Sequence, residues 1–110
     1  MHRRVMTTDA RHRIDKFTVP SDSMDEFLTQ VRHIHRLFDD QPGLLRNDIT
    51  VLADGPSGFN VATVVSWESQ DALERAGRVV GEDARARGFD RAQFMATLGV
   101  IGDFGTYAGL

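Results

Sequence analysis

Apolar positions that recur at spacings of three and four predict a helix from about Ser23 to Asp40. The apolar stripe of this helix comprises Met24, Phe27, Leu28, Val31, Ile34 and Phe38. At about 100° per residue, His35 falls on the stripe between Leu28 and Phe38, whereas His33 falls on the opposite side. The pattern therefore predicts one inward-facing and one outward-facing histidine.

Short β-rich runs bounded by proline and glycine predict four strands, and two further helical segments follow the third strand. The strands are "HRIDKFTVP", "LLRNDITVLAD", "FNVATVVSW" and a last one around "GDFGTYAG". We expect Ser69 to cap the helix "QDALERAGRVVGEDARAR", Gly88 to end it, and Asp90 to cap "RAQFMATL". This order predicts an α+β fold of the ferredoxin-like split βαβ type, with helices on one face of an antiparallel sheet.

The third predicted strand is apolar on both sides, which a sheet covered on one face does not require. One side carries Phe59, Val61, Thr63, Val65 and Trp67, and the other carries Asn60, Ala62, Val64 and Ser66. We expect Leu44 and Leu52 to extend the second apolar side. A second copy of the same sheet would cover it, so the sequence predicts a twofold homodimer.

The 110 residues fit one domain, which we place at residues 13–110 after a disordered basic tail at 1–12. A net charge of -3 gives no electrostatic support for a nucleic-acid partner. The chain has no apolar run long enough for a membrane span, and its lack of cysteine is compatible with the cytoplasmic location that we expect.

Four segments together resemble the antibiotic biosynthesis monooxygenase family. They are "IDKFTVPSDSMDEFL", "QPG", "VVSWESQDALERA" and "GFDRAQFMATLG". The resemblance covers nearly the whole chain after residue 12 and implies a dimeric α+β barrel made of two ferredoxin-like sheets. Some members of that family oxidise polycyclic phenols to quinones with molecular oxygen and no cofactor, and others degrade haem.

His35 is the leading catalytic candidate, because an imidazole exchanges protons near neutral pH and burial favours its neutral, basic form. The alternative is a structural histidine bonded to a backbone carbonyl or to Asp48. A metal site formed by His33 and His35 is disfavoured, because ligands on one helix converge at a spacing of four residues. Members that bind haem place a histidine on the second helix, whereas this chain has no histidine after His35.

Trp67 resembles the tryptophan that lines the family's pocket, and its indole could stack on a flat aromatic ligand. The alternative is packing in the core or at a dimer interface. Position 63 is threonine, where family members often carry asparagine. The expected substrate-binding residues are Trp67, Phe27, Phe38, Val31, Asp48 and Thr63, with no metal.

With His35 as the base, the resemblance implies a monooxygenase without a cofactor that acts on a small aromatic or polyketide-type substrate. A cyclase or isomerase of the same fold could use the same base without oxygen. A dimeric ligand-binding or accessory protein without catalytic activity is the third interpretation.

Overall fold

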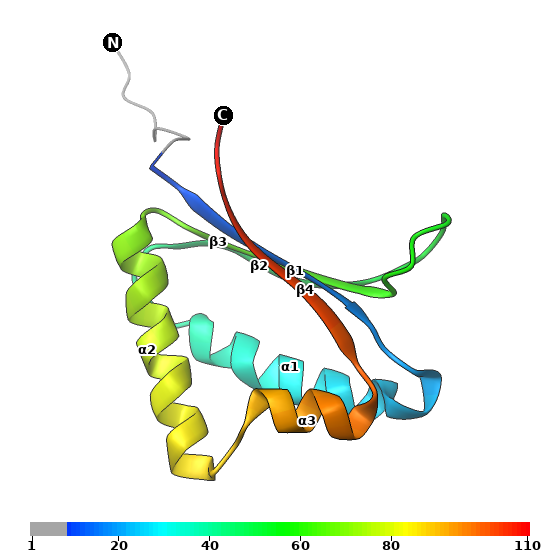
Figure 1. The fold of residues 1–110 in the computed structure, drawn as a ribbon. Helices are drawn as coiled ribbons and strands as arrows, with labels where there is room; N and C mark the ends of the chain where they lie inside the picture. The colour runs from blue at the N-terminus through cyan, green and yellow to red at the C-terminus, as the bar shows by residue number, and fades with distance from the viewer. Residues whose placement is uncertain (1–8) are drawn as a thin grey trace.

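The computed structural model describes residues 9–110, and its elements follow the predicted order. The strands are β1 (Arg11–Thr18), β2 (Leu44–Val51), β3 (Val61–Trp67) and β4 (Ile101–Ala108). The helices are α1 (Met24–Phe38), α2 (Gln70–Arg87) and α3 (Arg91–Leu98), with a short 3₁₀ turn, η1 (Ser21–Ser23), before α1. All the helices lie on one side of the sheet (Figure 1).

The four strands form one antiparallel sheet in the order β2-β3-β1-β4, which confirms the ferredoxin-like fold. Strand β1 lies inside the sheet and begins at Arg11. The predicted boundary of the tail was therefore wrong by two residues, because Arg11 and His12 pair with β3 and β4. Residues 1–8 of the predicted tail lie outside the described part of the chain.

Most helix ends lie at the residues that the sequence predicts. Ser69 and Asp90 cap α2 and α3 by accepting backbone amides, and Gly88 ends α2 with a φ of +64°. No side chain caps the start of α1. The hydroxyl of Ser23 instead donates to the carbonyl of Leu98 at 2.8 Å and so ties the start of α1 to α3.

The core between sheet and helices consists of two clusters. One contains Phe17, Val19, Phe27, Val61, Leu98 and Val100, and the other contains Val65, Trp67, Ala72 and Ala76. On β3 a single position separates them, because Thr63 stands between Val61 and Val65 on the helix-facing side. The predicted alternation of this strand is confirmed, and a polar residue marks the gap in its apolar row.

The other face of the sheet is covered by no helix in the described structure (Figure 1). Ala62 and Val64 of β3 lie on it beside Ile14 of β1. The expectation that Leu44 extends this face was wrong, because an irregularity between Leu44 and Arg46 turns Leu44 toward Trp67 in the core.

His33 faces away from the sheet, yet it packs against α2 and is not simply solvated. Its Nε2 lies 2.9 Å from Oδ2 of Asp83, which also accepts from Nε of Arg87 at 2.9 Å. The hydrogen bond from His33 is the main cause that lowers the pKa of Asp83. Arg87 continues the contact back to α1 by donating to Oε1 of Gln30.

We predict that Gly43→Ala destabilises the fold more than Gly55→Ala. Both glycines have positive φ, at +86° and +108°, so alanine strains both backbones. A Cβ at Gly43 would also lie 2.7 Å from Cβ of Ala72, whereas one at Gly55 meets no atom within 4 Å. We expect losses in free energy of unfolding of about 2–4 kcal/mol and about 1 kcal/mol, measured in urea. Equal losses would contradict the role given to the close contact with α2.

Candidate functional site

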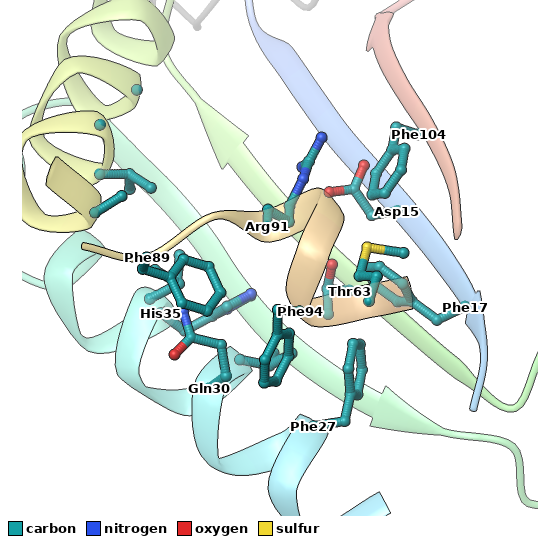
Figure 2. A pocket seen from close by; sticks show the side chains of 17 residues that line it. Asp15, Phe17, Phe27, Gln30, His35, Thr63, Phe89, Arg91, Phe94 and Phe104 are labelled. Atoms are coloured by element: carbon teal, nitrogen blue, oxygen red, sulfur yellow. The ribbon is translucent and has the colours of Figure 1, made fainter. Parts of the chain in front are cut away.

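A cavity of about 360 Å³ lies between the helix-facing side of the sheet and the three helices (Figure 2). This volume is within the range typical of small-molecule pockets. Aromatic rings make up much of its wall, namely Phe17, Phe27, Phe89, Phe94 and Phe104. The cavity therefore suits a flat apolar molecule.

His35 lines this cavity and is oriented by Asn47 of β2. Its Nδ1 lies 2.5 Å from Oδ1 of Asn47. The amide nitrogen of Asn47 donates to the backbone carbonyl of His35 at 2.8 Å and to Oδ1 of Asp39 at 3.0 Å. Because the amide nitrogen already serves two acceptors, the amide oxygen faces the imidazole.

This contact sets the tautomer of His35. A carbonyl oxygen can only accept, so Nδ1 carries the proton that it donates to Asn47, and Nε2 keeps its lone pair. Within residues 9–110, the only buried side-chain nitrogen or oxygen without a partner is Nε2 of Gln30. Nε2 of His35 makes no hydrogen bond to the protein within these residues and is not fully buried, and we place its accessible surface on the cavity.

Burial lowers the pKa of His35 below its ordinary value of 6.5. The hydrogen bond that His35 donates to Asn47 opposes this shift, as do the negative charges of Asp15, Asp39 and Asp48. The desolvation of the charged form is the larger effect. The imidazole is therefore neutral at pH 7, with a free lone pair on Nε2, which is the form that a general base requires.

Three of the expected substrate-binding residues share the cavity with His35: Phe27, Val31 and Thr63. Trp67 and Phe38 do not line it. Trp67 is 2% exposed and meets Phe38 edge to face at 5.4 Å between ring centroids. Phe38 in turn contacts the His35 ring at 5.5 Å, so the two aromatic residues form packing behind the imidazole.

Asp48 lies outside the cavity, contrary to its expected role. It stands opposite Val64 in the register, on the helix-free face, and forms an ion pair with Arg46. Side chains alternate along a strand, so its neighbour Asn47 points toward the helices. The hydrogen bond to His35 that the structural alternative gave to Asp48 is thus made by Asn47.

Sequence reasoning missed several polar residues of the site. Asp15 pairs with Thr63 across β1 and β3 and lies on the face of Phe17, so strand alternation could have identified it. Asn47 shares the face of Ile49 in the same way. Arg91 carries no such signal, because its position depends on how α3 returns to the sheet.

Gly77 and Gly81 of α2 also line the cavity. Neither is required by close packing, because a Cβ at Gly77 would meet no atom within 4 Å and one at Gly81 only the end of Arg85 at 3.8 Å. At these two positions of α2 no side chain occupies the space beside the cavity, which widens it, whereas Val80 and Ala84 of the same helix line it with their side chains.

The family model of the antibiotic biosynthesis monooxygenases matches residues 11–78, more than half of the chain. The chain belongs to this family. The match spans His35, Asn47 and Thr63 and ends before α3. No curated protein matches the sequence significantly.

Solved structures share the family fold at low sequence identity. SnoaB, a cofactor-independent oxygenase from Streptomyces nogalater, is 18% identical with a TM-score of 0.61, and the alignment covers 93% of this chain and 94% of SnoaB. A protein from Nitrosomonas europaea named for the same family is 17% identical, with a TM-score of 0.69 and coverages of 96% and 94%.

A heme-degrading protein from Mycobacterium tuberculosis is 20% identical, with a TM-score of 0.53 and coverages of 62% and 77%. Helix α2, where the resemblance implies a haem ligand, contains no histidine. Within residues 9–110 no group of three histidine or acidic side chains could hold a metal ion. No helix there has the length and apolar character needed to cross a bilayer.

We predict that substitutions of Asn47 move the pKa of His35 in opposite directions. Asn47→Leu removes the acceptor for Nδ1, so the pKa falls further and both neutral tautomers become populated. Asn47→Asp supplies a charged acceptor, so the pKa rises above that of the wild type. Imidazole ¹⁵N chemical shifts recorded against pH measure both effects.

The His33 resonances in the same spectra serve as the internal control, because His33 contacts Asp83 on the other side of α1. Changes of equal size in the ¹⁵N chemical shifts of His33 and His35 would indicate a general change in the protein. A wild-type His35 protonated on Nε2 in its neutral form would contradict the proposed orientation of the amide.

Proposed function

We propose that this protein is a cofactor-independent monooxygenase that oxidises a small aromatic, polyketide-type phenol in the cytoplasm. The observation that carries the proposal is the neutral imidazole of His35, held by Asn47 with Nε2 free in an aromatic cavity. Family membership supports the same chemistry.

In this proposal Nε2 of His35 accepts the proton of the phenol hydroxyl, and the phenolate becomes electron-rich enough to react with oxygen. One electron passes from the phenolate to O₂, and the resulting radical pair joins at a ring carbon. The peroxide anion takes the proton back from the imidazolium of His35 and becomes a hydroperoxide. Loss of water from that carbon leaves a quinone. One phenol and one O₂ thus give one quinone and one water, and the substrate itself supplies the electrons.

The apolar wall supports this reaction in two ways. Phe27 and Phe94 offer ring faces and edges against which a flat substrate can pack. Exclusion of water also strengthens the interaction between the phenolate and the protonated imidazole, because charges attract more strongly at low dielectric. Thr63 adds one hydroxyl within the wall that can bond to a substrate oxygen.

We further propose that the protein acts as a homodimer whose subunits pack through the helix-free face of the sheet. Ile14, Ala62 and Val64 form an apolar centre on that face, and Tyr107, half exposed, stands at its edge opposite His12. An apolar centre bordered by polar side chains, here Lys16 and Asp48, is typical of a protein–protein interface.

We predict that His35→Ala lowers kcat/KM at least about 100-fold, because a positioned general base contributes on this scale. Oxygen uptake and quinone absorbance with 1-naphthol or 1-anthrol as test substrate measure the effect. His33→Ala, on the same helix but facing α2, is the matched control and should keep the wild-type rate. Circular dichroism checks that both variants are folded.

The wild-type rate should rise with pH through the lowered pKa of His35 and level off above it, because only the neutral imidazole accepts a proton. A folded His35→Ala variant with an unchanged rate would remove His35 from the mechanism. Binding of the phenols without oxygen uptake would favour the isomerase or the ligand-binding interpretation.

We predict that Val64→Asp converts a dimeric protein into a folded monomer, because it places a charge at the centre of the proposed interface. Sedimentation velocity measures the mass of each species. Ala92→Asp, at an exposed position in the first turn of α3, introduces the same charge on the helical side and should leave the dimer intact. A wild-type protein whose mass is that of a monomer at all concentrations would refute the dimer.

A further inference from the structure

The end of the cavity nearest β4 contains two charged side chains, Asp15 and Arg91. Nε of Arg13 lies 2.7 Å from Oδ1 of Asp15, so the charge of this carboxylate is already matched. None of the ion pairs formed within residues 9–110 includes Arg91. The cavity wall therefore has one cation without a carboxylate partner.

An aromatic ring holds the guanidinium of Arg91 in place. Its Cζ lies 4.3 Å from the centroid of the Phe104 ring, a cation–π contact. The ring folds over Gly102, where a Cβ would come within 2.5 Å of it. It also contacts Phe17 at 5.7 Å between centroids, and Cζ of Arg13, the partner of Asp15, lies 5.8 Å from its centroid. Figure 2 shows Arg91, Asp15 and Phe104 together, away from His35.

A stacked guanidinium keeps its edge free, and this edge presents two parallel N–H groups that match the two oxygens of a carboxylate. The rest of the wall is mainly apolar and aromatic, so it suits the body of the same ligand. The charge and shape at this end of the cavity therefore favour a ligand that combines a carboxylate with an apolar aromatic body.

We propose that the cavity binds an aromatic carboxylate whose acid group pairs with Arg91 while its rings lie against the phenylalanine wall. Anchored there, the ring system extends toward His35, which would make Arg91 a determinant of substrate specificity. The link to turnover rests on the proposed function, whereas the binding preference does not.

The test compares two ligands of nearly the same shape, 2-naphthoate and its neutral counterpart 2-naphthamide, by NMR titration of ¹⁵N-labelled protein. We expect the wild type to bind naphthoate about tenfold more tightly, because a hydrogen-bonded charge pair contributes on this scale. The preference should decrease as ionic strength rises. Arg91→Gln should bind both ligands equally.

Arg78→Gln is the matched control, because it removes the same charge from an exposed position of α2 that does not line the cavity. It should keep the wild-type preference, and Arg91→Lys should keep only part of it, since an ammonium lacks the planar fork. Equal wild-type affinities, a preference that survives in Arg91→Gln, or no binding of either ligand would overturn the proposal.

The result is separable from that of the oxygenase test. If naphthamide and naphthoate bind equally and phenol oxidation still depends on His35, the proposed function stands without an acidic substrate. If the preference depends on Arg91 while no phenol consumes oxygen, the cavity is an aromatic-acid site without this catalytic activity.

Discussion

The alternation of side chains along β3 is the constraint on which the rest of this structure depends. Val61, Val65 and Trp67 all face the helices, and they anchor the two halves of the core. Thr63 occupies the position between them, where its small polar side chain cannot join either cluster. The helices consequently close over a hollow at this point.

The hollow becomes chemically specific through one contact between α1 and β2. The side-chain amide of Asn47 directs all its hydrogen bonds to the end of α1, and the imidazole of His35 is one of the partners. A neutral histidine without such a partner exchanges between two tautomers and several orientations. Here the same amide ties the helix to the sheet and selects which ring nitrogen faces the cavity, so stability and chemistry rely on a single side chain.

Local periodicity predicted the parts of the site that depend on one element. The helical spacing placed His35 inward, and the strand alternation placed Thr63 beside it, both as observed in the cavity wall. The errors arose where two elements meet. Trp67 was expected at the pocket, but Phe38 stands between it and His35, and Leu44 changed sides because of an irregularity that the sequence does not signal.

The site residues that the sequence analysis missed also divide into those that one strand places and those whose position depends on how several elements meet. Asp15 and Asn47 lie on strand faces that alternation predicts, and they became meaningful only once the register brought them near Thr63 and His35. Arg91 depends on the path of the chain after α2, which no local pattern specifies. The match to the family model does not include Arg91 either, because the matched segment ends at residue 78.

The two glycines of α2 have a consequence for how this family member can diverge. Each weakens the helix by about 0.5–1 kcal/mol relative to alanine, although a Cβ at Gly77 would meet no atom within 4 Å. Folding alone would therefore favour replacing them. Successive replacements with alanine, valine or leucine would shorten the cavity stepwise on an unchanged backbone. The length of the ligand that fits can therefore evolve through substitutions at Gly77 and Gly81 alone, while His35 and Asn47 are retained.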